Sequence, residues 1–153
     1  MLLTQDEIIK IVREGQANGE TFVVTNGCFD ILHVGHVRYL LKTKEYADKL
    51  IVMLNSDKSV KAIKGETRPI NCEEDRAEIL SSLSCVDYVV LFDENSPAKL
   101  LENIKPDVYT KGADYTLETL PERDIVIKNN IKVEFIDFVE GKSTTNVIKK
   151  INS

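Results

Sequence analysis

The chain has 153 residues, 42% of them hydrophobic and 29% charged, which is typical of a globular protein with a sizeable core. Its net charge of −5 argues against a protein built to bind nucleic acid or an anionic membrane surface. No apolar run approaches the ~20 residues of a membrane-spanning helix, and the N-terminus lacks the pattern of a signal peptide. Three cysteines without metal-ligand spacing predict reduced thiols in a cytoplasmic protein.

Helices and strands are predicted to alternate along the chain. Thr4 and Glu7 have the spacing of a capping box, so a helix should begin there and end at Asn18-Gly19. Continuous apolar runs predict buried parallel strands, and the spacers between them predict helices on both sheet faces. Strands are expected over residues 22–25, 50–54, 88–91, 107–110 and 132–136, and further helices over 36–46, 71–83, 97–104, 117–130 (interrupted) and 146–151.

The predicted fold is a Rossmann-like three-layer α/β sandwich with a five-stranded parallel sheet. Residues 1–20 are expected to form an N-terminal helix ahead of a domain over residues 21–153. A basic, glycine-containing stretch between Lys58 and Pro69 is interpreted equally well as a solvated loop or as a functional segment. Asn71 and Glu74 are expected to cap the helix that follows it.

The most informative segment joins the first long apolar strand to the next helix. It holds both histidines of the chain, His33 and His36, which lie three residues apart and so share one face of a helical turn. Glycines at a tight strand-to-helix turn, here Gly27 and Gly35, place backbone N–H groups and a helix N-terminus where an anion can bind. The segment therefore predicts a phosphate site.

Polar clusters follow four of the predicted strands. They should meet at one edge of the sheet, because ligands of an open parallel sheet bind beyond the carboxyl ends of its strands. Together they offer many hydrogen-bond donors and no obvious nucleophile, which suits the stabilisation of charge on phosphate oxygens. The clusters lie at residues 26–36, 55–57, 111–115 and 140–145.

Three other kinds of site fit less well. The segment 140–144 resembles the end of a P-loop, but position 136 is isoleucine where that motif needs glycine. A hydrolase built on Ser143 would need a glycine-flanked nucleophile elbow. A zinc site at His33 and His36 would need a third cysteine or histidine nearby.

Several separated motifs carry a resemblance to a known family. The pattern Gly27-x-Phe29-Asp30 with His33-x-Gly35-His36 resembles the signature of the nucleotidyltransferases related to class I aminoacyl-tRNA synthetases. Further motifs resemble the heptose 1-phosphate adenylyltransferases, in order, over about residues 21–151; they are Asn55-Ser56-Asp57, Lys64-Gly65-x-x-Arg68-Pro69, Lys111-Gly112-x-Asp114-Tyr115 and Ser143-Thr144-Thr145. In many bacteria this domain is fused to a kinase, and here it is expected to stand alone.

The resemblance implies transfer of AMP from ATP to D-glycero-β-D-manno-heptose 1-phosphate, giving ADP-heptose and pyrophosphate for cell-surface glycan assembly. A sugar phosphate, with a second pKa of about 6, is largely ionised at neutral pH and can attack the α-phosphorus in line without a general base. Catalysis then consists of positioning and charge stabilisation. Mg²⁺ is expected to accompany ATP, with no metal site of the protein's own, and related enzymes suggest a homodimer.

The same resemblance implies residue roles. His33, His36 and Lys111 would be catalytic, donating hydrogen bonds as charge moves onto the leaving pyrophosphate. Lys64, Arg68 and Tyr115 are candidates for the sugar phosphate. The nucleotide-binding residues would be Asn26, Gly27, Cys28, Phe29, Asp30, Gly35, Asn55, Asp57, Arg76, Gly112, Asp114, Ser143, Thr144 and Thr145. For Arg76 a surface salt bridge is an almost equal alternative. The family often has a second glycine where this chain has Ala113.

Three other functions are weighed. A glycerol-3-phosphate cytidylyltransferase resembles this chain in fold and in its Glu-Gly-x-Ser-Thr-Thr segment, but carries an arginine where this chain has Phe138. A nucleotide sensor without turnover would not need His33, His36 and Lys111 together. A tRNA synthetase core is disfavoured by the short length and acidity of the chain.

Overall fold

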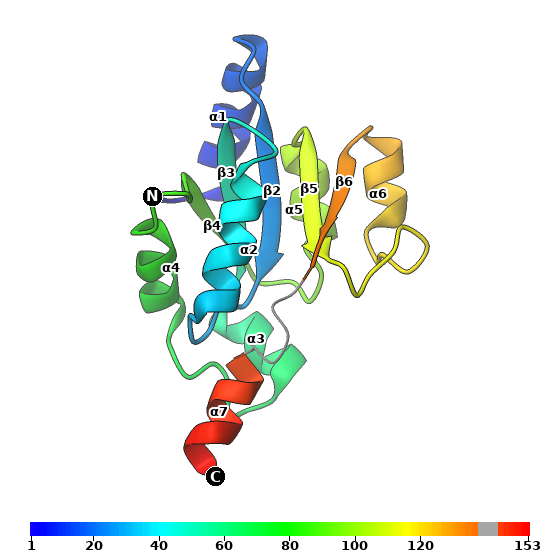
Figure 1. The fold of residues 1–153 in the computed structure, drawn as a ribbon. Coiled ribbons are helices and arrows are strands. Elements are labelled where there is room, and N and C mark those ends of the chain that lie inside the picture. Colours follow the sequence, from blue (N-terminus) through cyan, green and yellow to red (C-terminus); the bar gives the residue numbers. More distant parts are fainter. Residues whose placement is uncertain (138–143) are drawn as a thin grey trace.

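The structure, a computed structural model, describes residues 1–137 and 144–153. In these ranges all strands run parallel in one sheet, ordered β1 (Leu2–Leu3), β4 (Tyr88–Phe92), β3 (Lys49–Asn55), β2 (Phe22–Gly27), β5 (Val108–Gly112) and β6 (Lys132–Ile136) (Figure 1). The helices are α1 (Gln5–Ala17), α2 (Val34–Lys44), α3 (Asp57–Lys64), α4 (Glu73–Ser81), α5 (Ala98–Ile104), α6 (Arg123–Lys128) and α7 (Thr144–Asn152).

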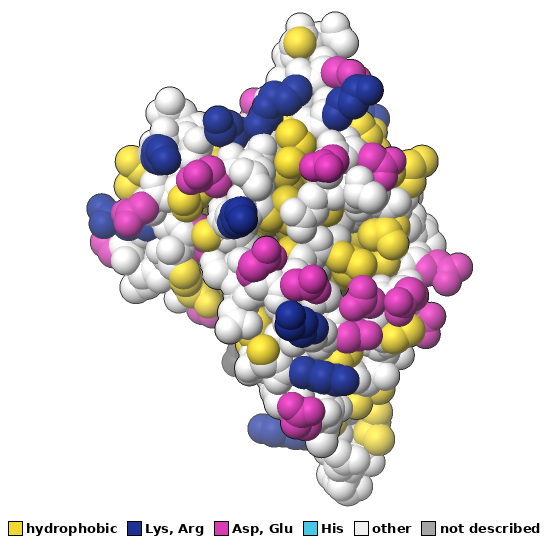
Figure 2. Space-filling model, turned by 180° about the vertical axis from the view of Figure 1, so that it is seen from behind, with side chains coloured by type: hydrophobic (Ala, Val, Ile, Leu, Met, Phe, Trp, Pro, Cys, Tyr) yellow, Lys and Arg dark blue, Asp and Glu magenta, His cyan; other side chains and the backbone are white. Residues whose placement is uncertain are grey.

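Helices cover both faces of the sheet, which confirms the predicted three-layer α/β fold. Alternate residues of β2 point to opposite sides, as the two-residue period of a strand requires. Phe22 and Val24 pack with α1, α5 and α6, whereas Val23 packs with Leu40 of α2 and Leu80 of α4. On the face seen from behind, acidic and basic side chains are scattered among apolar ones and no histidine appears (Figure 2).

The sheet has a sixth strand where five were predicted. The additional strand, β1, is only Leu2–Leu3 and pairs with Val89 and Val90 of the edge strand β4. Two residues are too short to produce a periodic pattern, so this strand is visible only through its backbone pairing.

Two helix starts differ from the predictions and one agrees. The capping box of α1 is confirmed, since Glu7 N donates to Thr4 Oγ1 at 3.2 Å and Thr4 N donates to Glu7 Oε1 at 3.0 Å. The first part of the basic stretch is the helix α3, begun by Ser56 as its N-cap, rather than a loop. Cys72, not Asn71, is the N-cap of α4, because both nitrogens of Asn71 bond to Asp30.

The chain reverses its direction across the sheet between β2 and β5. From β2 it proceeds to β3 and β4 on one side, and β5 and β6 continue on the other. Such a reversal leaves a crevice at the carboxyl ends of the two central strands, which is where ligands bind in open α/β sheets. The loop after β2 and the start of α2 lie at this crevice (Figure 1). Among the helices of the described ranges, none is long and apolar enough to cross a membrane.

Candidate active site

The two histidines cap the N-terminus of α2. His33 is the N-cap residue, and its Nδ1 accepts a hydrogen bond from Gly35 N at 3.1 Å. Its own backbone N donates to His36 Nδ1 at 3.3 Å, which completes a capping box. Because each Nδ1 accepts, each neutral ring carries its proton on Nε2. The pair is therefore fixed as two Nε2–H donors at a helix N-terminus.

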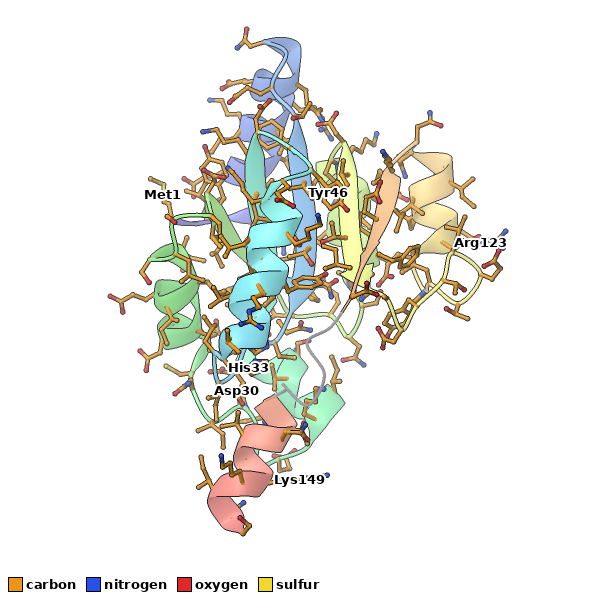
Figure 3. The ribbon with its side chains drawn as sticks, viewed as in Figure 1. Met1, Asp30, His33, Tyr46, Arg123 and Lys149 are labelled. Atoms are coloured by element: carbon orange, nitrogen blue, oxygen red, sulfur yellow. The ribbon has the colours of Figure 1, made fainter. Side chains whose placement is uncertain are left out.

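The His33 ring also affects the protonation of His36. The two rings are stacked with centroids 3.9 Å apart, and Phe29 lies 5.2 Å from the His36 ring. Burial and, less strongly, the positive charge of a protonated His33 lower the pKa of His36 to about 4. His36 is thus neutral at pH 7 and stays a hydrogen-bond donor through Nε2. Asp30 and His33 lie together in the loop between β2 and α2 (Figure 3).

A cavity of about 770 Å³ opens over this loop at the switch point of the sheet. A volume of this size lies within the usual range for small-molecule sites. Of the residues predicted for the site, the cavity is lined by Asn26, Gly27, Cys28, Phe29, Asp30, His33, Gly35, His36, Asn55, Lys64, Arg68, Lys111, Gly112, Asp114, Tyr115 and Thr145. The structure therefore brings together residues from five separate motifs.

The turn that follows β2 is held in an unusual backbone conformation. Phe29 has a φ of 45°, in the left-handed region that non-glycine residues seldom adopt. Its ring lies so close to Gly27 that a Cβ there would come within 2.8 Å of Phe29 Cε2. Glycine is required at position 27 because the Phe29 ring folds back over it.

Arg76, predicted to be either a nucleotide ligand or part of a surface salt bridge, does not line the cavity. It is fully buried, and its guanidinium donates to three backbone carbonyls, those of Asn71 (2.9 Å), Cys28 (2.8 Å) and Asn55 (2.7 Å). It also pairs with Asp57 at 2.8 Å, so Asp57 serves this junction and does not line the cavity either. Arg76 is a positioning residue that ties the loops after β2 and β3 to the start of α4.

Asp30 performs a similar task for the loop before α4. Its carboxylate accepts hydrogen bonds from Ile70 N and Asn71 N, both at 2.9 Å, and from Arg68 Nε at 3.0 Å. Burial would raise the pKa of Asp30, but these hydrogen bonds and the Arg68 charge outweigh it and hold that pKa below its ordinary value. The side chain of Arg68 is thereby fixed at the cavity wall.

Lys111 lies on the other side of the switch point, on β5. Its Nζ donates to Asn26 Oδ1 at 3.3 Å and lies 5.1 Å from the centre of the Tyr115 ring. Tyr109 Oη donates to the same Asn26 oxygen at 2.7 Å. Asn26 thus orients the ammonium group that, with the histidine pair, makes the cavity attractive to an anion.

The remaining predicted residues are Ser143, Thr144 and Thr145. Thr145 lines the cavity, and Thr144 begins α7. Phe138, Ser143 and residues 140–143 of the segment that resembles a P-loop lie outside the described residues. The predictions missed several lining residues, because no motif marks them; they are Tyr39, Ile63, Asn95, Ser96, Pro97, Pro121, Glu122 and Asn146.

The site suits phosphate better than a resident metal ion. Within the described ranges, no cluster of three or more histidine, cysteine, aspartate or glutamate side chains is arranged to hold a metal. Asp30 and Asp57 are already paired with arginines. The residues present fit Mg²⁺ that arrives on a nucleotide and is held largely by its phosphates.

An all-parallel α/β sheet with a helix N-terminus over its switch point places the described part of the chain in a class of α/β proteins in which this position commonly binds phosphate-bearing ligands. Comparison with known families narrows this class. Residues 24–150 match the cytidylyltransferase-like family, and the chain belongs to that family.

The chain is also similar to longer proteins. It is 51% identical over 146 residues to the bifunctional protein HldE of Geobacter metallireducens, covering 95% of this chain and 30% of that protein. It is 57% identical over 136 residues to the bifunctional protein HldE of Campylobacter concisus, covering 89% and 28%. The chain therefore spans less than a third of the length of these relatives.

The chain also shares its fold with a solved structure, over nearly the whole length of that structure. That structure is of a lipopolysaccharide core biosynthesis protein from Thermoplasma volcanium, 33% identical, with a TM-score of 0.63. The match covers 79% of this chain and 98% of that one.

Proposed function

We propose that the chain transfers AMP from ATP to D-glycero-β-D-manno-heptose 1-phosphate, releasing pyrophosphate and forming ADP-heptose. The observation that carries the proposal is the pair of imidazoles, His33 and His36, at the N-terminus of α2, which line the same cavity as Lys111. The family match, the order of the sugar-specific motifs and the relatives named above support it.

The residues suit a single displacement at phosphorus. An oxygen of the sugar phosphate forms a bond to the α-phosphorus of ATP while the bond from that phosphorus to the β-phosphate bridging oxygen breaks. The electron pair goes to the leaving pyrophosphate. The two imidazole donors and the N-terminus of α2 stabilise this growing charge, and Lys111 neutralises charge on the phosphates. No proton needs to be removed from the acceptor, which agrees with a site made mainly of donors.

Two further basic residues of the cavity lining suit the second substrate. Lys64 and Arg68 line the cavity from α3 and the loop after it, and Arg68 is oriented by Asp30. Two anions must meet in this reaction, and cations in the cavity lining reduce their repulsion. Mg²⁺ belongs to the nucleotide substrate in this scheme. A cytoplasmic location fits three free cysteines, and a homodimer remains a prediction.

Pyrophosphate release tests the proposal. ATP and CTP are each combined with heptose 1-phosphate and with glycerol 3-phosphate in the presence of Mg²⁺. We expect release only from ATP with the heptose. Release from CTP with glycerol 3-phosphate would instead establish the cytidylyltransferase alternative, and ATP binding without any release would favour the nucleotide sensor.

Variants connect the activity to the site. His36→Ala and Lys111→Ala should each lower kcat by about 10²–10³-fold, the usual effect of removing one donor to a transition-state oxygen. Lys99→Ala is the matched control, because Lys99 is exposed on α5 and does not line the cavity. Its kcat should equal that of the wild type.

A further inference from the structure

Glu122 is a buried carboxylate in the wall of the cavity. It lies between Pro121 and the start of α6 and is only 2% exposed. Lys111 and Tyr115 line the same cavity. Neither the motifs nor the mechanism above assigns a role to this side chain.

One of the two carboxylate oxygens of Glu122 has no hydrogen-bond donor in the described part of the chain. Glu122 Oε2 is buried without a hydrogen-bond partner there, and the side chain does not cap α6. Burial and the negative charge of Glu122 both raise the pKa of Tyr109, so its hydroxyl is within electrostatic reach of the carboxylate. That hydroxyl, however, donates to Asn26 at 2.7 Å. Lys111 also donates to Asn26, at 3.3 Å, and forms no ion pair within the described ranges.

A buried carboxylate oxygen without a donor destabilises the folded state, and such costs concentrate at functional sites. The missing donor cannot be a phosphate, whose oxygens are negatively charged and would be repelled. A hydroxyl group fits, because it donates to a carboxylate and brings no charge of its own. The nucleotide ribose and the acceptor sugar of the proposed reaction both carry neighbouring hydroxyl groups.

We propose that Glu122 recognises a hydroxyl group of a substrate, accepting its hydrogen bond at Oε2 and keeping phosphate away from this end of the cavity. The assignment rests on the proposed function for the identity of the substrates. In this assignment Glu122 is a specificity residue that accepts a hydrogen bond from a substrate, whereas His33 and His36 donate hydrogen bonds.

Glu122→Gln tests the proposal, because glutamine keeps the shape and removes the charge. Glu118→Gln is the matched control, since Glu118 is exposed in the same segment and does not line the cavity. Calorimetry measures the binding of ATP, 2′-deoxy-ATP, 3′-deoxy-ATP and heptose 1-phosphate, beside turnover and the melting temperature. Binding is measured directly, so Glu122 is tested even if the wild type proves inactive and the proposed function fails.

We expect Glu122→Gln to bind one of the two substrates about tenfold to a hundredfold more weakly, the usual range for a hydrogen bond to a charged group. Its melting temperature should equal or exceed that of the wild type, because a desolvated charge is removed. If the ribose is the ligand, the wild type should prefer ATP over one deoxy nucleotide and the variant should lose that preference. If the acceptor is the ligand, only the affinity for heptose 1-phosphate should fall.

Three results would overturn the assignment. Affinities within twofold of the wild type for both substrates would show that Glu122 touches neither. A lower melting temperature would show that the carboxylate supports the fold. A higher Mg²⁺ requirement with unchanged substrate affinities would show that it holds the metal ion that arrives with ATP.

Discussion

His33 and His36 stack with ring centroids 3.9 Å apart while each accepts a backbone N–H at Nδ1. The same arrangement therefore caps the N-terminus of α2, places the proton of each neutral ring on Nε2 and lowers the pKa of His36. Two imidazolium ions at this separation would repel each other strongly. A bound triphosphate would relieve this repulsion, which makes the protonation of the pair dependent on the ligand.

Nucleotide binding should therefore be accompanied by proton uptake. In the free protein the pKa of His36 is about 4, so His36 is neutral at pH 6. Negative phosphate charge beside the ring raises that pKa, and part of the bound protein takes up a proton. Calorimetry in buffers of different ionisation enthalpy should show an uptake that increases from pH 7.5 to pH 5.5. An uptake that is the same in the His36→Asn variant would contradict this origin.

The same pKa makes stability depend on pH. The pKa of His36 is lower in the folded state, about 4, than its ordinary value of 6.5. Between these values the unfolded state binds more protons, so the free energy of unfolding decreases as the pH falls from 6.5 to 4. In His36→Asn, Oδ1 can still accept the His33 N–H, and this part of the decrease should disappear. Urea unfolding of both proteins across this range gives the comparison, and parallel curves would contradict the prediction.

Removal of Arg76 should destabilise the whole fold. Arg76→Met leaves three carbonyls and Asp57 without their donor, which should lower the free energy of unfolding by about 3–5 kcal/mol. Arg76→Lys should recover little, because an ammonium group cannot span the same acceptors. Arg123→Met, at an exposed arginine on α6, is the control and should change stability by less than ~0.5 kcal/mol. Denaturant unfolding measures all three, and a stable, inactive Arg76→Met protein would instead indicate direct contact with the nucleotide.

Replacement of Asp30 should loosen the loop before α4 specifically. Asp30→Asn weakens the hydrogen bonds to the backbone N–H groups of Ile70 and Asn71 and releases Arg68. Hydrogen exchange of those two amides should accelerate about tenfold to a hundredfold, the range for bonds to a charged acceptor. Asp48→Asn is the control, because Asp48 caps the start of β2 through Thr21 and lies away from this loop. Unchanged protection in Asp30→Asn would show that the loop is held by other contacts.

The sequence predicted those parts of the molecule that have a local signature. Capping at Thr4 and Glu7, buried apolar strands, and glycines around His33 and His36 depend on neighbours in the chain, and the structure confirms them. Strand β1 was missed because it is defined by pairing with β4, 87 residues further on. Helix α3 was missed because its basic side chains resemble those of a solvated loop.

The roles of individual site residues were harder to predict. Arg76 was assigned to the nucleotide, but its partners are mostly backbone carbonyls from other loops, and a sequence does not show which carbonyls a fold will bring together. Glu122 was missed for a related reason. A glutamate before a short helix is ordinarily exposed, and only the packing of this turn buries its carboxylate.

A single competition reaction tests whether the protein transfers AMP to heptose 1-phosphate. ATP, CTP, heptose 1-phosphate and glycerol 3-phosphate are supplied together in equal amounts with Mg²⁺, and the product is identified by mass spectrometry. We expect ADP-heptose to be the dominant product and to be lost in His36→Ala. CDP-glycerol as the dominant product, or an ADP-heptose yield that His36→Ala leaves unchanged, would contradict this expectation.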